Sequence, residues 1–433
     1  MVGYKKIIQG IGLFLGMIIV LWLFMIVSAT VPNSMLQENM QKSALYYTKS
    51  EAFAYCNGEK MNGITDNYAD SIWVNVAWYM GRGNAVVSSI DTKYYDGEQQ
   101  GQNVGLYQAV TQEETEANTD YTRYWHGTAG VIRILHLFTD VNGIKYAGFV
   151  AAMALAATVM ILLIRDGKDM VAITFFLSLC MVKIWNVRLS MEYQPAFILG
   201  FGFCILYLLY EKKGNQGLLA LAVVSGVMTS FFDFLTTETV TILLPLILVI
   251  TVRTMDGRIG KWKENMILLV TQGIAWLLSY GMTFPVKWIL ASVVTGENKF
   301  ATALNLAEER MNGAVHTIVG ENQFPQIFAA PAANLSALFG GAERMQTVPV
   351  ILGILLVVLF VMISVIFLWK GKEENRTATT LLLLLGGSVL VRYMVLSNHS
   401  YLHSFFTYRG LVSLVMAMLS VLMINNRKCI TMQ

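Results

Sequence analysis

Two aspartates stand four residues apart in a polar stretch near the start of the chain. They open and close the segment Asp66-Asn67-Tyr68-Ala69-Asp70. Two carboxylates raise each other's pKa when they lie close together, because each disfavours the negative charge of the other. A carboxylate whose pKa is raised can act as a general base near neutral pH. Asp66 and Asp70 are therefore the candidate catalytic residues.

Both aspartates also have simpler explanations. The apolar residues at 71–80 indicate a short helix, and Asp70 stands where its N-cap is expected. Asp66 can be an ordinary solvated loop residue. Because capping accounts for Asp70 and not for Asp66, we favour Asp66 as the base.

A second polar segment, Arg123-Tyr124-Trp125-His126-Gly127, precedes another helix with an apolar stripe, expected at 128–138. Arg123 and His126 can form charge-assisted hydrogen bonds with a phosphate or bind a sugar hydroxyl. The alternative is that the arginine and the aromatic residues anchor the segment at a membrane surface.

The elements that must position these segments are membrane helices. The 433 residues are 55% hydrophobic and 14% charged, with a mean hydropathy of +0.54, whereas soluble domains average roughly 25% charged residues. We predict an all-α polytopic membrane protein with about ten transmembrane helices. The expected spans are residues 7–27, 146–164, 170–185, 195–209, 218–234, 238–252, 266–284, 348–367, 378–396 and 410–424.

The positions of lysine and arginine give this arrangement an orientation. With ten spans, every link on one side is basic: it contains Arg165 and Lys168; Lys212 and Lys213; Arg253, Arg258, Lys261 and Lys263; Lys370, Lys372 and Arg376; or Arg427 and Lys428. Basic links remain in the cytoplasm. Both termini are therefore expected in the cytoplasm, and a bacterial plasma membrane is the expected location.

Three regions follow from these spans. Residues 1–30 hold the first transmembrane helix, with cleavage as a signal peptide near residues 28–30 as the alternative. Residues 31–145 form a large extracytoplasmic loop with two interfacial helices, and residues 83–120 within it are expected to be peripheral, with a short strand at 84–90. Residues 146–433 form the multi-span domain, with an outer loop at about 285–347.

Further ionisable residues gather at the outer ends of the expected spans. Such residues are costly near a bilayer and are candidates for function, although each can also form an ion pair that settles helix packing. Together with Arg123 and His126 they are the candidate substrate-binding residues: Arg188, Glu192, Asp233, Glu238, Arg392, His399, His403 and Arg409.

Composition argues against several other classes. Of the four cysteines only Cys56 lies in the large loop, so no disulfide framework is expected. Paired cysteines and histidines at metal-binding spacing are missing, so we expect no metal and no other cofactor. A net charge of +3 does not suggest a nucleic-acid partner.

The order of these parts resembles the integral-membrane C-type glycosyltransferases, the GT-C superfamily. The likeness rests on a first helix, a large outer loop, the acidic segment 66–70 and the segment 123–127 ahead of two short helices, and many spans with short links. It implies transfer of a sugar from a polyprenyl-phosphate-linked or diphosphate-linked donor to a glycan or lipid acceptor on the outer face. It also implies that Asp66 or Asp70 is the base and that basic residues hold the leaving phosphate. The Asp-Glu pair of many members is absent, because Asn67 follows Asp66.

Three other functions remain open at this point. A transporter or flippase of lipid-linked saccharides often shows inverted repeats and broken helices at mid-membrane, which the sequence does not show. A polysaccharide polymerase or ligase is expected to have its largest outer loop late in the chain. A non-catalytic assembly partner would use the aromatic loop as a docking surface.

Overall fold

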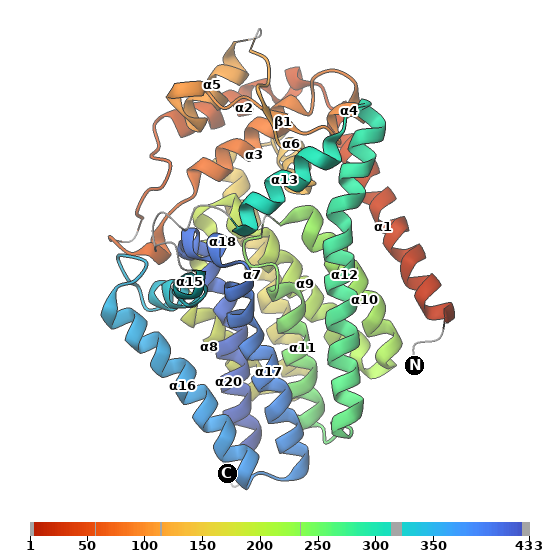
Figure 1. Cartoon of the computed structure of the whole chain (residues 1–433), viewed down its shortest axis with the longest axis vertical. Helices are drawn as coiled ribbons and strands as arrows, with labels where there is room; N and C mark the ends of the chain where they lie inside the picture. The colour runs from red at the N-terminus through yellow and green to blue at the C-terminus, as the bar shows by residue number, and fades with distance from the viewer. Residues whose placement is uncertain (1–3, 57, 113–114, 234, 313–322, 427–433) are drawn as a thin grey trace.

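The computed structural model describes residues 4–56, 58–112, 115–233, 235–312 and 323–426, and it is almost entirely helical (Figure 1). A bundle of long helices carries a layer of short helices at one end, formed by residues 33–140. The two termini lie toward the opposite end of the bundle. The prediction of an all-α membrane protein is consistent with this architecture.

Within the described residues, seven stretches are long and apolar enough to cross a membrane. They contain α1 (Tyr4–Thr30), α7 (Val141–Arg165), α9 (Pro195–Tyr210), α12 (Trp262–Thr295), α16 (Thr347–Lys370), α17 (Glu373–Val395) and α20 (Val412–Asn425). The shorter helices are α8 (Asp169–Met181), α10 (Asn215–Phe232), α11 (Val240–Met255) and α15 (Gln323–Leu338). Every expected span coincides with a helix, and three of the ten expected spans fall on the shorter set.

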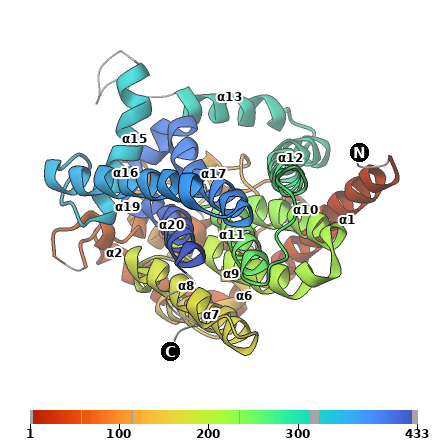
Figure 2. The ribbon, with the colours of Figure 1, turned by 90° about the horizontal axis from the view of Figure 1, so that it is seen from below.

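The centre of the bundle is α11, which is buried on all sides from Val240 to Val252. It packs against α9, α10, α17 and α20, which surround it when the bundle is viewed along its axis (Figure 2). A helix that is apolar all round is stable only when other helices cover it. The turn that precedes α11 is therefore fixed at the outer end of the core.

The outer layer is built around α3 (Asn67–Tyr79). The other elements of this layer are α2 (Asn33–Thr48), η1 (Met61–Gly63), α4 (Ala85–Ser88), β1 (Lys93–Tyr94), η2 (Glu98–Gln100), α5 (Gln102–Thr111), β2 (Thr119–Asp120) and α6 (Gly127–Leu135). The strands pair antiparallel, with Lys93 opposite Asp120.

Two expectations about this layer are wrong. Residues 71–79 of α3 are all buried, because α2 and α5 cover the helix, so α3 is the core of the layer rather than a helix lying on the membrane surface. Residues 83–120 supply part of that cover and are not peripheral, and the strand expected at 84–90 is replaced by α4.

The outer loop expected from residue 285 begins later. The helix α12 continues through Pro285 to Thr295, so its 34 residues form a single rod about 51 Å long. The helix α13 (Lys299–Asn312) then follows, and residues 313–322 of the expected loop lie outside the described residues. The remaining links are η3 (Ile184–Leu189), η4 (Met191–Tyr193), η5 (Glu211–Lys213), α18 (Ser397–Leu402), α19 (Ser404–Thr407) and η6 (Tyr408–Leu411).

Candidate functional site

The structure places the N-cap of α3 at Asp66, whereas the sequence predicted it at Asp70. Asp66 is the N-cap of α3, because its Oδ1 accepts a hydrogen bond from the backbone N–H of Ala69 at 2.8 Å. Asp70 lies inside the first turn and is not the cap, which corrects the expectation from the sequence. The helix begins one turn earlier than its apolar run, since residues 67–69 adopt helical geometry behind the cap of Asp66.

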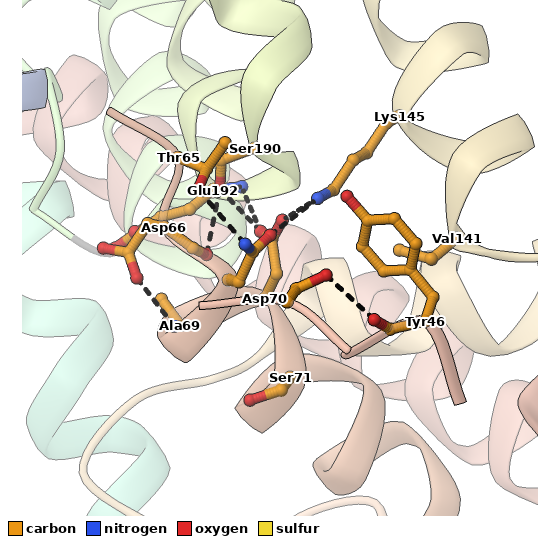
Figure 3. A network of polar contacts seen from close by, with 12 residues as sticks. Tyr46, Thr65, Asp66, Ala69, Asp70, Ser71, Val141, Lys145, Ser190 and Glu192 are labelled. Carbon is orange, nitrogen blue, oxygen red and sulfur yellow. Dashed lines mark hydrogen bonds and ion pairs between the residues drawn. The ribbon is translucent and has the colours of Figure 1, made fainter. Parts of the chain in front are cut away.

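Asp70 is fully buried and has three polar partners (Figure 3). Its carboxylate lies 2.9 Å from Nζ of Lys145, accepts 2.7 Å from Oγ of Ser190 and accepts 3.2 Å from the backbone N–H of Glu192. These partners come from α7 and from the link before α9. The charge of Asp70 is thus compensated, and its carboxylate joins the outer layer to the bundle.

Asp66 is 2% exposed, and its carboxyl group meets that of Glu192. Burial raises the pKa of Asp66 to about 7, and the nearby negative charge of Asp70 adds to the rise. The hydrogen bonds with Ala69 and Glu192 and the charge of Lys145 act in the opposite direction. With its pKa raised to about 7, Asp66 can exchange a proton near neutral pH.

A second acidic pair lies in the turn before α11. Asp233 accepts hydrogen bonds from the backbone N–H and the hydroxyl of Thr236, and burial together with the charge of Glu238 raises its pKa to about 7. Glu238 binds Arg392 through both carboxylate oxygens, at 2.7 and 2.8 Å. The structure therefore brings Asp233, Glu238 and Arg392 together, and the charge of Asp233 also acts on Glu192.

Arg392 and His399 fix the backbone of this turn. The carbonyl oxygen of Leu235 accepts 2.6 Å from Arg392 and lies 2.9 Å from Nε2 of His399. Leu235 has a φ of 62°, a left-handed conformation that an L residue with a side chain rarely adopts. His403 lies beside His399, with 4.6 Å between ring centroids.

Arg409 is a buried cation without a carboxylate partner among the described residues. It is 1% exposed, and none of its guanidinium nitrogens donates to a described acceptor with hydrogen-bond geometry. The group lies over the rings of Tyr193, at 4.3 Å, and Tyr408, at 5.0 Å. Tyr193 follows Glu192 in the chain and donates 3.0 Å to the carbonyl of Ile64, two residues before Asp66. Arg409 is therefore a candidate anion-binding group close to the carboxyl pair.

The segment before α6 occupies another part of the same end. Arg123 lies over the rings of Tyr121 and Tyr124, at 4.3 and 5.2 Å. His126 is buried, its Nε2 lies 2.8 Å from the carbonyl of Tyr121, and burial lowers its pKa well below its usual range. His126 is therefore uncharged at neutral pH. Arg188 is exposed and forms no ion pair with any residue that the structure describes.

Two lysines that support the site were missed. The expected boundaries place Lys145 at the end of the large loop at 31–145 and Lys287 in the outer loop at about 285–347. Lys287 is fully buried in α12 and donates to the carbonyl of Tyr124 and, at 3.1 Å, to the hydroxyl of Thr92. A single lysine beside an apolar span was the available signal, since such a residue needs a partner.

Comparison with known proteins identifies no relative from which a function could be inferred. No protein-family model, curated protein or solved structure matches this chain. Among the described residues no three histidine, cysteine, aspartate or glutamate side chains are arranged to hold a metal ion. The site contains two neighbouring buried carboxyl groups, Asp66 and Glu192, and a second acidic pair. It also contains a buried arginine that has no carboxylate partner within the described part of the chain.

Proposed function

We propose that the protein is a membrane glycosyltransferase that uses a polyprenyl-phosphate-linked sugar and modifies a glycan or lipid acceptor on the outer face of the membrane. Asp66 is the general base in this proposal. The basic links gather at the end of the bundle opposite the site, which supports an extracytoplasmic position for the site and cytoplasmic termini.

The observation that carries the proposal is the burial of the Asp66 carboxyl group next to a second carboxyl group, that of Glu192. A general base is most effective when its pKa is close to the working pH, and burial raises the pKa of Asp66 to about 7. Asp70 is less suited, because Lys145, Ser190 and the backbone of Glu192 already occupy its carboxylate. Asp66 therefore takes the catalytic role and Asp70 a positioning role.

The transfer needs a base and a cation. The acceptor oxygen forms a bond to the anomeric carbon and gives its proton to Asp66, while the bond between that carbon and the phosphate oxygen breaks and leaves its electron pair on the phosphate. A fixed cation in a water-poor site stabilises this developing charge. Arg409, buried and without a carboxylate partner among the described residues, is suited to that role.

The decisive experiment replaces Asp66 with asparagine in the full-length protein. Asparagine caps helices about as well as aspartate, so Asp66→Asn removes the base and retains the cap. We expect sugar transfer from radiolabelled polyprenyl-phosphate sugars, in membranes, to fall by about 10²–10⁴-fold. The matched control is Asp166→Asn, which removes an exposed carboxylate at the other end of the bundle.

Two results contradict the proposal. One is full transfer by Asp66→Asn. The other is movement of a lipid-linked sugar across sealed vesicles without a new glycosidic bond, which would identify a transporter.

A further inference from the structure

An apolar groove of about 280 Å³ lies between α6, α7, α9 and α10. The residues around it extend from Thr128 to Leu135 on α6 and from Met191 to Leu199 along η4 and α9, with Phe232 at the end of α10. The groove is partly open, and α7 and α9 belong to the stretches able to cross a membrane. Its occupant can therefore enter sideways from the bilayer.

The groove offers its occupant apolar contacts and no free hydrogen-bond donor. Thr128 and Gln194 are the residues with polar side chains around it. The hydroxyl of Thr128 donates 2.7 Å to the carbonyl of Phe232, and the amide of Gln194 donates 2.8 Å to the carbonyl of Lys145. A sugar or a charged group would lose its hydrogen bonds to water there, which is costly. A hydrocarbon chain would lose none.

Two residues that line the groove are followed in the chain by acidic residues of the site. Met191 and Phe232 line the groove, and the next residue in each case is Glu192 or Asp233. These acids lie with Asp66 and Asp70, and the cation among them, Lys145, is already bound to Asp70. An anionic head group would find no free counter-ion among these groups, whereas a hydroxyl group can donate to a carboxylate. Arg409, which suits an anion, stacks on Tyr193. The groove itself is lined by neither of these two residues, nor by Glu192 or Asp233.

We propose that this groove holds the hydrocarbon chain of the acceptor, and that the acceptor is a lipid with an uncharged head group bearing a hydroxyl. The proposal rests on the proposed function, and it selects a lipid from the two classes of acceptor. In this proposal the hydroxyl of the head group reaches Asp66 and Glu192, while the donor phosphate binds at Arg409.

A matched pair of lipids tests this proposal on the full-length protein in nanodiscs. The first probe is diacylglycerol with a diazirine on one acyl chain, and the second is phosphatidic acid with the same chain. The two differ only in the phosphate. After irradiation and digestion, we expect mass spectrometry to find diacylglycerol, in preference to phosphatidic acid, attached to residues 128–135 and 191–199.

Two leucines on α9 give matched variants. Leu199 lines the groove, whereas Leu206, seven residues along the same helix, is 37% exposed and does not line it. Leu199→Trp fills the groove and should reduce labelling by diacylglycerol about tenfold, because several methylene contacts are lost. Leu206→Trp should leave labelling unchanged. Met228→Trp fills the groove from α10 and replaces Leu199→Trp if that variant does not fold.

Each other outcome overturns the proposal. Equal labelling by both probes indicates an ordinary boundary lipid, and stronger labelling of the groove by a diazirine-bearing polyprenyl phosphate assigns it to the donor. Labelling does not require transfer. If the groove variants lose labelling while Asp66→Asn retains transfer, the proposed function is wrong and the lipid site remains. If Asp66→Asn abolishes transfer and the groove variants label normally, the proposed function stands and only the lipid site in the groove is wrong.

Discussion

Nζ of Lys145 lies 2.9 Å from Oδ2 of Asp70, and both side chains are buried where the outer layer meets the bundle. This ion pair joins the helix that carries Asp66 to the first helix after the outer layer. Its partners Ser190 and Glu192 extend the contact to the link before α9. This compensated charge is therefore one of the contacts that hold the outer layer on the bundle.

Removal of one partner of this pair should be far more harmful than removal of both. Lys145→Met leaves the carboxylate of Asp70 buried without a counter-ion, and we expect a loss of about 3–5 kcal/mol in the free energy of unfolding. Asp70→Asn combined with Lys145→Met should recover most of that loss. Unfolding in mixed detergent and dodecyl sulfate measures both. The control is Lys42→Met, which breaks an exposed pair with Glu38 and should have no measurable effect. A similar loss of unfolding free energy in the single and the double variant would argue against a structural ion pair between Asp70 and Lys145.

The rate of transfer should rise with pH through about 7. Burial raises the pKa of Asp66 to about 7, so below that pH most of the base carries a proton, and kcat/KM should fall about tenfold for each further pH unit. A flat profile between pH 5 and 8 would exclude Asp66 as the titrating base.

The same pKa has an opposite consequence for stability. The pKa of Asp66 is about 7 in the folded protein, whereas the ordinary pKa of an aspartate is near 3.9. The carboxyl group therefore stabilises the fold most at a pH below 3.9, and this contribution is lost as the pH rises from there through about 7. We therefore expect the free energy of unfolding to decrease between pH 4 and pH 7, and to decrease less in Asp66→Asn. The unfolding assay above, repeated across this pH range, measures the difference.

Arg409 should be necessary for transfer and unfavourable for stability. A buried cation without a counter-ion is costly, so Arg409→Met should raise the free energy of unfolding by about 1 kcal/mol or more, while transfer falls by about 10²-fold or more through loss of charge stabilisation. Thermal unfolding and the transfer assay are compared on one preparation. A loss of stability in Arg409→Met would show that the guanidinium is a structural element instead.

Arg392 should hold the turn before α11 through its shape as well as its charge. Arg392→Lys retains the charge but cannot bind both oxygens of Glu238 and also the carbonyl of Leu235. We expect a loss of about 2 kcal/mol and faster amide hydrogen exchange in residues 235–240. Arg376→Lys, at an exposed arginine near the other end of α17, serves as the control. Unchanged exchange in Arg392→Lys would show that the turn does not depend on this pairing.

The bundle could be predicted from sequence because its signal is local. Each apolar run became a helix, since a membrane helix satisfies its own backbone hydrogen bonds. The end of α12 could not be predicted, because Pro285 and the polar residues after it indicate a loop, and contacts of Lys287 and Trp288 with the outer layer continue the helix instead.

The outer layer was predictable only in part. The choice of segment 66–70 as a candidate site followed from residue type, but the contacts of its two aspartates depend on Ala69, Lys145 and Glu192. The last two lie far along the chain, where no local pattern connects them to Asp66. The burial of α3 has the same cause: its apolar residues suggested a membrane surface, and the cover that replaces the membrane comes from α2 and α5.

The length of α12 links the outer layer to the thickness of the bilayer. The helix is about 51 Å long, whereas the hydrocarbon core measures roughly 30 Å. Through Lys287 and Trp288 its outer end binds the backbone of Arg123 and Tyr124. A helix responds to a thinner or thicker bilayer by changing its tilt, and a rigid rod transfers that tilt to the segment it holds. We therefore expect the chain length of the lipids to change the position of Arg123 through the tilt of α12, without any ligand.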